Sequence, residues 1–407
     1  MKYDWLLAGA EERELTARQK PLFAAGYAFL LLYAIAAHVS IAIASIAIAG
    51  GVLTLIILLF SNRRRVSITR QQAITGKVFI LFCLCVGLTT PFSNDPSASI
   101  IGTLGTVGRF MPMFLAMFFI ISRKQIKWLV IALVASVLIA DIAAIGHLLK
   151  GEQTKGFLNN RIYFANQLLP MVILSIACLF DRQYSITMRS FIGLAAVLTI
   201  GVFVFSMVRG AWVAAAAVYL IFILTNKRLN RKIVASSGVL GIAVITCFLI
   251  RPELLDRLKT IVTANAGSLE RINMWFSAWK MFMDSPLFGL GYRQFGHYFT
   301  TDYHYLMPGT IYTGYAHPHN VFMTFLAETG LVGTIPFLCF FAVVLYYTYS
   351  NYYRANSIPS MVAFLATWGF LVGGLTDNVF AMPTVMRIIA LLIGISLSNV
   401  VTEKQLD

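Results

Sequence analysis

Charged residues are scarce in this chain of 407 residues, and acidic residues are the scarcest. Only 12% of the residues are charged, about half the share typical of soluble domains, while 58% are hydrophobic. So few charges could not cover a soluble core of this apolarity. The apolar residues instead form blocks of roughly 17 to 25 residues, the length that crosses a bilayer. The composition excludes an ordinary soluble enzyme and predicts a membrane protein.

Cysteines are few, and neither a signal peptide nor an internal repeat is evident. The five cysteines all lie inside apolar blocks, so we interpret them as packing residues, neither disulfides nor metal ligands. The polar segment from Met1 to Lys20 lacks the short apolar run of a cleavable signal peptide. No repeat of 20–50 residues is evident. The net charge of +15 would suggest nucleic acid in a soluble protein, but the basic residues stand mostly between apolar blocks, so no nucleic-acid partner is expected.

Twelve apolar blocks are candidate membrane spans, each long enough to cross a bilayer. They cover residues 22–38, 39–60, 77–92, 100–121, 128–149, 162–180, 190–208, 211–225, 233–250, 321–347, 360–382 and 384–401. We therefore expect an all-α integral membrane protein of about twelve transmembrane helices, in contact with membrane lipids.

Lysine and arginine in the short loops predict the orientation. Alternate loops are basic; their basic residues are Arg63, Arg64, Arg65, Arg70, Arg123, Lys124, Lys127, Arg182, Arg189, Lys227, Arg228, Arg231 and Lys232. The opposite loops are poorer, and residues 93–99 carry no lysine or arginine. The pattern predicts that both termini are cytoplasmic.

One hydrophilic stretch of about 70 residues, 251–320, interrupts the spans on the outer side. It divides the chain into three segments: residues 1–250 with nine spans, the loop 251–320 with short helices, and residues 321–407 with three spans. Because this loop contains four of the six histidines, we expect it to carry part of the active site.

Arginines on the outer side are unexpected, because positive charge is disfavoured there. They are Arg109, Arg161, Arg209, Arg251, Arg257, Arg271, Arg293 and Arg387. Each alone could extend its head to the interface, or pair with an outer acid such as Asp377. Together they suggest a pocket for a membrane-anchored phosphate or pyrophosphate, since guanidinium groups bind phosphate oxygens in a bidentate fork.

A predicted amphipathic helix, Ser268 to Asp284, presents Arg271 in the middle of its apolar face. Asn273 and Ser277 fall on the predicted polar face, and Trp279 on the apolar one. Arg271 therefore points toward the membrane domain or the headgroups, and it either lies along the interface or binds an anion there.

Two histidines, His317 and His319, stand where the outer loop re-enters the membrane, next to Asn320. A neutral imidazole is the usual general base near neutral pH. Three other interpretations remain open: a metal site shared with His297 and His304, ordinary interfacial residues, and a proton relay. The spacing matches no helical zinc motif.

Four segments together resemble the O-antigen ligase and polymerase superfamily of integral-membrane enzymes. They are Asn159 to Asn166, Ser206 to Trp212, Arg271 with Trp275 and the following Ser285 to Gly291, and His319-Asn320 with Ala327 to Gly330. The resemblance implies a metal-independent glycosyltransferase that needs no cofactor. It implies a bacterial inner-membrane location and an active site facing the periplasm.

In the ligase branch, which we favour, the resemblance implies transfer of a glycan from undecaprenyl pyrophosphate to a sugar hydroxyl of the lipid A core. By motif, His319 would be the general base, and Arg209 and Arg271 would hold the pyrophosphate. We expect further substrate contacts from Arg109, Arg161, Arg293, His317, Asn320 and Asp377. A single base on the face opposite the leaving group suggests direct displacement with inversion, and no glycosidase-like carboxylate pair is evident.

Several alternatives stay open. The polymerase of the same superfamily would use a growing glycan as acceptor, and a third relative would glycosylate protein hydroxyls. From another class, a transporter or flippase for lipid-linked glycans would show charged residues near the midplane, for which Asp141 is the best candidate, and repeat symmetry. A purely structural membrane protein is disfavoured by the outer arginines, and the sequence leaves a homo-oligomer open.

Overall fold

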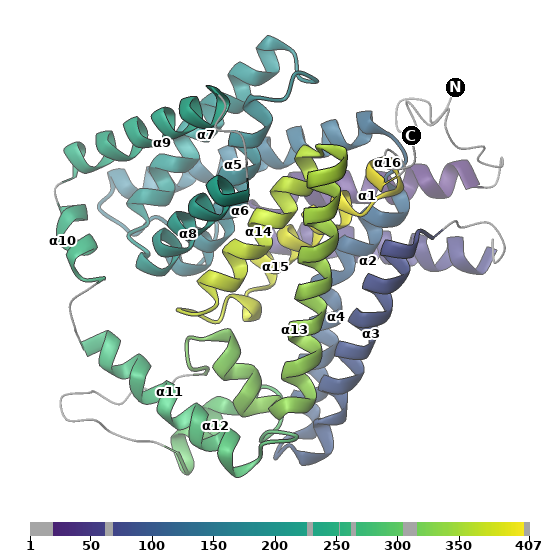
Figure 1. Cartoon of the computed structure of the whole chain (residues 1–407), viewed down its shortest axis with the longest axis vertical. Helices are drawn as coiled ribbons and strands as arrows, with labels where there is room; N and C mark the ends of the chain where they lie inside the picture. The colour runs from purple at the N-terminus through teal and green to yellow at the C-terminus, as the bar shows by residue number, and fades with distance from the viewer. Residues whose placement is uncertain are drawn as a thin grey trace.

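The computed structural model describes residues 19–61, 68–225, 231–251, 253–261, 266–303 and 316–402, and every regular element in them is a helix. Figure 1 shows the arrangement. Before the long loop come α1 (Gln19–Ala36), α2 (Ile41–Ser61), α3 (Arg70–Leu88), α4 (Pro96–Phe119), α5 (Arg123–Leu149), α6 (Arg161–Leu179), α7 (Ile186–Phe205), α8 (Arg209–Thr225) and α9 (Arg231–Ile250). The loop contains α10 (Glu253–Lys259), α11 (Ala266–Asp284) and α12 (Phe295–Thr301). After it come α13 (Val321–Ala355), α14 (Ile358–Gly373), α15 (Pro383–Ser396) and the short α16 (Asn399–Thr402).

The expected all-α membrane architecture is confirmed. Eight helices of the described residues are long and apolar enough to cross a membrane. The shorter apolar helices α8, α14 and α15 occupy three further predicted spans, and α9 matches the predicted span at 233–250. The chain is therefore a multi-pass membrane protein. Its division at residues 250 and 320 into three segments stays a prediction.

Two predicted boundaries are wrong. Residues 360–382 were expected as one span, but α14 ends at Gly373. Asp377 accepts a hydrogen bond from the backbone N–H of Asn378, and Asn378 accepts one from that of Ala381. Such local side-chain bonds compete with the helical ladder and favour a turn. The helix α3 begins at Arg70, seven residues before the predicted start of its span, because Thr69 and Gln72 form a capping box there.

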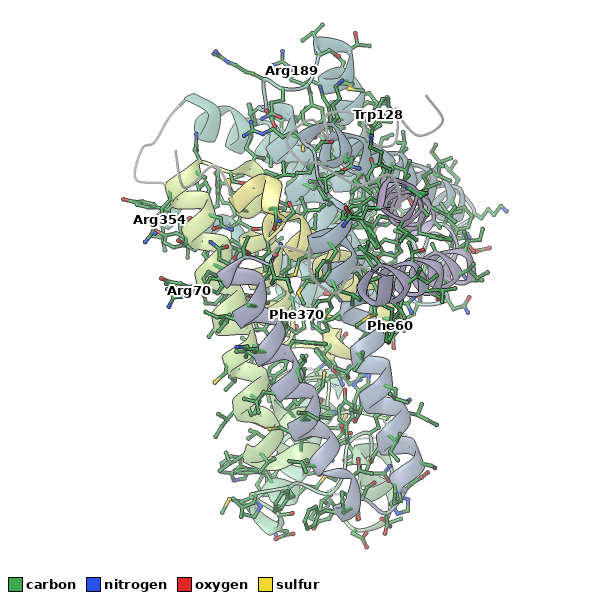
Figure 2. All side chains as sticks on the ribbon, turned by 90° about the vertical axis from the view of Figure 1, so that its right-hand side faces the viewer. Phe60, Arg70, Trp128, Arg189, Arg354 and Phe370 are labelled. Atoms are coloured by element: carbon green, nitrogen blue, oxygen red, sulfur yellow. The ribbon has the colours of Figure 1, made fainter. Side chains whose placement is uncertain are left out.

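Helix ends that the basic loops place on one side of the membrane do meet. Gln71 at the start of α3 exchanges side-chain hydrogen bonds of 3.0 and 3.1 Å with Asn351 near the end of α13. Figure 2 shows Arg70 and Arg354 near each other at this end. At the opposite end of α3 and α4, Ser99 donates to the carbonyl of Tyr292 in the long loop at 2.8 Å. The compartment that each end faces stays a prediction; Arg63, Arg64, Arg65, Lys227 and Arg228 lie outside the described residues.

The helix α13 is two helices joined at Gly330, where the φ and ψ angles of 55° and −156° are not helical. The first part therefore belongs to the loop side and the second to the membrane bundle, although the sequence predicts one continuous span. Phe325 and Phe337 stack across the break with their ring centroids 4.2 Å apart. Both rings are buried in a phenylalanine cluster between α3, α4 and α13, which holds the two parts together.

Candidate active site

The long loop is attached to the break in α13 by backbone hydrogen bonds. Leu290 N–H donates to the carbonyl of Ala327 at 2.9 Å, and Leu331 N–H donates to that of Pro286 at 2.9 Å. A Cβ on Gly330 would lie 2.5 Å from the carbonyl carbon and oxygen of Leu287, so only glycine fits this contact at a positive φ. The non-helical conformation at Gly330 therefore makes room for the backbone of the long loop.

Glu328 fixes the next part of the loop. Its buried carboxylate accepts hydrogen bonds from the backbone N–H groups of Arg293, at 2.8 Å, and Phe295, at 3.0 Å. The side chain of Arg293 is exposed, and its aliphatic carbons lie against Gly102 of α4. Arg293 was predicted to contact substrate; it does not line the arginine-rich pocket described below.

The histidine turn, residues 316–320, leads from the loop into α13 and is joined to the turn after α14. Asn320 caps α13 by accepting hydrogen bonds from Phe322 N–H and Met323 N–H, and its amide donates to the carbonyl of Leu375 at 3.1 Å. Val321 N–H donates to the carbonyl of Gly374 at 2.7 Å. The polar atoms of Asn320 thus position the turn; its predicted contact with substrate stays a prediction.

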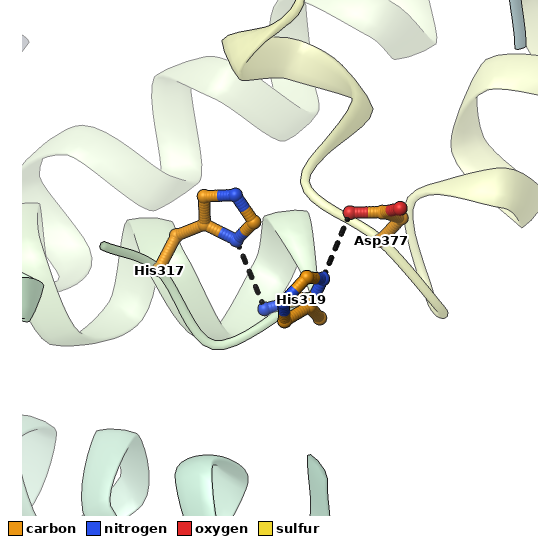
Figure 3. A group of neighbouring side chains, drawn as sticks. All are labelled: His317, His319 and Asp377. Atoms are coloured by element: carbon orange, nitrogen blue, oxygen red, sulfur yellow. Dashed lines mark hydrogen bonds and ion pairs between the residues drawn. The ribbon is translucent and has the colours of Figure 1, made fainter. Parts of the chain in front are cut away.

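This junction brings His319 and Asp377 together, 58 residues apart in the chain. Nδ1 of His319 lies 3.1 Å from Oδ1 of Asp377, as Figure 3 shows. A carboxylate only accepts, so Nδ1 carries the proton and the lone pair of the neutral imidazole is on Nε2. His319 also has a φ of 50°, an uncommon conformation for a residue other than glycine and one that clusters at functional sites.

The surroundings of Asp377 and His317 favour an ionised carboxylate at Asp377 and a neutral ring at His317, which suits a base at His319. Burial alone would raise the pKa of Asp377, but the hydrogen bond from His319 and the electrostatic interactions with His319, His317 and Arg271 outweigh it and lower the pKa below its usual value. Nδ1 of His317 accepts a hydrogen bond from the backbone N–H of His319 at 3.3 Å. Burial lowers the pKa of His317 to about 4, so this ring is neutral near pH 7.

The helix α11 supports the turn, because Trp275 donates its indole N–H to the carbonyl of Pro318 at 2.9 Å. The predicted faces of this helix are only partly right. Asn273 and Ser277, on the predicted polar face, are buried, and Trp279, on the predicted apolar face, is 45% exposed. The helix α11 packs against α13, and Ser277 donates its hydroxyl hydrogen to the backbone carbonyl of Asn273 one turn earlier. Arg271 does point to the membrane domain, as predicted.

An arginine pocket adjoins the histidine turn. Its guanidinium groups come from four segments and belong to Arg161, Arg209, Arg257 and Arg271. Asp377 also lines it and is the only carboxylate among its described lining residues, so the pocket is strongly positive. The helices α6 and α8 begin at Arg161 and Arg209, so the positive ends of their dipoles add to the positive charge of the pocket. These features together favour a multiply charged anion as the ligand.

Close packing holds the N-terminus of α8 in this pocket. Arg209 donates to the carbonyl of Thr260, and Arg257 donates to that of Met207 at 3.2 Å, so α10 and its following turn are tied to the turn between α7 and α8. Met207 has a φ of 56°. A Cβ on Gly210 would lie 2.3 Å from Oγ1 of Thr376, which explains the glycine after Arg209.

The structure therefore unites most of the predicted site residues and adds two. His317, His319 and Asp377 are neighbours, and Arg161, Arg209 and Arg271 share the adjoining pocket. Arg257 and Thr376 were not predicted as site residues. The only sequence signal for Arg257 was that it is an arginine on the outer side, in a short polar helix. No sequence signal pointed to Thr376. Arg109 lies outside this pocket, with its guanidinium 5.4 Å from the ring of Phe380.

The same three side chains could hold a metal ion, since ligand atoms of His317, His319 and Asp377 lie within 4.8 Å of one another. The predicted four-histidine cluster is not found in the described part of the chain. His297 bonds to Asn94 instead, at 3.1 Å, and His304 lies outside the described residues. The neighbouring guanidinium groups disfavour a cation here, because they repel it.

Comparison with known families favours one class of membrane protein. A family model described as O-antigen ligase matches residues 194–338. This part of the chain is similar to the O-antigen ligase superfamily. The matched residues include Arg209, Arg271 and His319, whereas Arg161 and Asp377 lie outside them. The match does not separate ligases from polymerases, and no curated protein matches the chain.

Proposed function

We propose that this protein is an O-antigen ligase that transfers a glycan from undecaprenyl pyrophosphate to a sugar hydroxyl of the lipid A core, in the bacterial inner membrane with its site facing the periplasm. The observation that carries the proposal is the His319–Asp377 pair at the edge of the arginine pocket. A base and a pyrophosphate site lie side by side, as one displacement at an anomeric carbon requires.

In this reaction the acceptor hydroxyl oxygen attacks the anomeric carbon, and its proton moves to Nε2 of His319. The bond from that carbon to the pyrophosphate oxygen breaks, and the electron pair leaves with the pyrophosphate. Asp377 holds the imidazole in the required tautomer and stabilises the imidazolium. The arginines stabilise the growing negative charge, so no general acid is needed. Attack opposite the leaving group inverts the anomeric carbon.

The lipid part of the donor has a fitting place beside the arginine pocket. An apolar groove of about 600 Å³ lies between α6, α7, α8, α9 and α14, and Val172, Phe203, Ala215 and Phe222 are among its walls. On α8 its lining begins at Trp212, one turn after Arg209, and continues to Phe222, about 15 Å along the helix. A polyprenyl chain in this groove places its pyrophosphate at the N-terminus of α8.

We also propose that the reaction needs no metal and that a polymerase, which would extend a growing glycan, is the nearest alternative. Purified protein in a chelator should still transfer glycan. Loss of activity with EDTA, restored by one added metal, would instead assign His317, His319 and Asp377 to a metal site. Transfer to lipid A core and not to a free O-unit acceptor would support the ligase over the polymerase.

The decisive experiment measures donor binding and turnover in parallel. His319→Ala should bind the lipid-linked donor normally but transfer it roughly 10²–10⁴-fold more slowly, because only the base is lost. Arg271→Ala should lose donor binding, and Arg271→Lys should restore little, since an ammonium lacks the planar fork. Loss of donor binding in His319→Ala, or normal turnover in Arg271→Ala, would contradict these roles.

A further inference from the structure

A second pair of arginines, Arg109 of α4 and Arg387 of α15, lies inside the membrane domain without a counterion. Neither forms an ion pair with any of the described residues. Nη1 of Arg109 donates to Thr106 at 3.1 Å and Nη1 of Arg387 to Ser45 at 3.0 Å, both neutral hydroxyls. Nε of each arginine is buried and lacks a hydrogen-bond partner. Two unneutralised cations in an apolar environment are costly unless an anion joins them.

The two charges act on one another, which increases that cost. Tyr33 and Arg109 are the titratable side chains that act on Arg387, and Arg109 repels it. Arg109 faces the ring of Phe380 and acts on the hydroxyl of Tyr292. Tyr33, Phe380 and Tyr292 are neutral near pH 7, so none of these described neighbours compensates the pair. Both arginines are partly exposed, so an anion can reach them.

This pair is separate from the arginine pocket, because neither Arg109 nor Arg387 is among the described residues that line it. Arg109 lies 5.4 Å from the ring of Phe380, in the same connection between α14 and α15 that carries Asp377. The arginine pocket reaches Asp377 from α6, α8, α10 and α11, whereas Arg109 and Arg387 lie on α4 and α15, which pack against each other. The connection that carries Asp377 thus adjoins both groups of arginines, which suits a transferase with two membrane-anchored substrates.

We propose that Arg109 and Arg387 bind a phosphate group of the acceptor. The proposal rests on the proposed function and states which substrate takes this second site. The ligand class is a phosphate ester on a membrane-anchored molecule, and it has two sources: a phosphorylated glycolipid acceptor or a common anionic phospholipid. The acceptor is the better fit because the site lies beside the base that must receive the acceptor's proton.

The test measures lipid binding directly, so it does not depend on transfer. Purified protein in nanodiscs is titrated with a phosphorylated glycolipid, the same glycolipid after phosphatase treatment, phosphatidylglycerol, and undecaprenyl pyrophosphate, and bound lipid is counted by native mass spectrometry. Arg109→Gln with Arg387→Gln should weaken binding of the phosphorylated glycolipid about 10- to 100-fold. Binding of undecaprenyl pyrophosphate should not change.

Arg354→Gln is the matched control, because it removes one exposed positive charge at the far end of α13. It should bind all four lipids as the wild type does. The double variant Arg109→Lys with Arg387→Lys keeps both charges and should retain part of the affinity for the phosphorylated glycolipid. That result would show that the double glutamine variant binds weakly because it lacks charge and not because it misfolds.

Three results would overturn the proposal. The phosphatase-treated glycolipid could bind as tightly as the phosphorylated one, phosphatidylglycerol could bind as tightly as either, or the double glutamine variant could lose undecaprenyl pyrophosphate. A wild type that binds the phosphorylated glycolipid through this pair but transfers no glycan would leave this inference standing and remove the proposed function.

Discussion

Under the proposed mechanism, Asp377 at the junction of the histidine turn and the α14 turn should have opposite effects on the two stages of the reaction. It bonds to the proposed base, His319, and it places a negative charge among the arginines of the pocket. Asp377→Asn should therefore lower turnover by about 10²-fold or more, because an amide can donate to Nδ1 and favour the wrong tautomer. Donor binding should be as tight as in the wild type or tighter. Weaker donor binding at normal turnover would refute this division of roles.

Burial of the His317 ring leads us to expect that the stability of the protein depends on pH. Its pKa is lowered by burial from 6.5 to about 4, so the unfolded chain binds a proton at a higher pH than the folded one does. The resulting stability is complete above about pH 6.5 and is lost as pH falls toward 4. Thermal unfolding in detergent should show a melting temperature that decreases over this window, and His317→Gln should reduce the decrease. An equal decrease in the variant would assign it to other groups.

Helix termini set the geometry of the pocket at the scale of elements. Gly210→Ala should weaken donor binding, because its Cβ would collide with Oγ1 of Thr376 and push the N-terminus of α8 away. Thr376→Ala removes that oxygen, and the next contact, 3.3 Å from Cβ of residue 376, is tight but needs a shift of only a few tenths of an ångström. The double variant should therefore bind donor better than Gly210→Ala alone, as equilibrium titration would show. Additive losses in the two variants would mean that this contact does not position α8.

The whole molecule predicts a definite topology, because Gln71 and Asn351, each next to a basic segment, meet at one end of the bundle, and Ser99 contacts the long loop at the other end. Reporter fusions after Asn62, Thr225 and Ser350 should give cytoplasmic signals, and fusions near Pro96 and Thr301 periplasmic ones. A cytoplasmic signal for the loop at 251–320 would also remove the proposed mechanism, since donor and acceptor are then on the wrong side.

The order of the apolar helices could be predicted from the amino-acid sequence, and the motifs singled out His319, Arg209 and Arg271 as candidate site residues. Apolar length is a local property, and the motifs are short, so both can be recognised without a fold. The breaks are less local. Gly330 ends a helix inside an apolar run only because the Pro286 to Gly291 segment packs against it, and the turn after Gly373 depends on polar side chains in a stretch that reads as a span.

Only the tertiary structure decided which charges meet. Asp377 could have paired with any outer arginine, but the junction of Val321 with Gly374 brings it to His319 instead. Arg257 joins the arginine pocket, where it bonds to the carbonyl of Met207, whereas Arg109 lies over the ring of Phe380 outside that pocket. The apolar blocks and the distribution of basic residues between them predict on which side of the membrane an arginine lies. Its neighbours come from helices far apart in the chain, and they are determined by helix packing and loop closure, which no local pattern records.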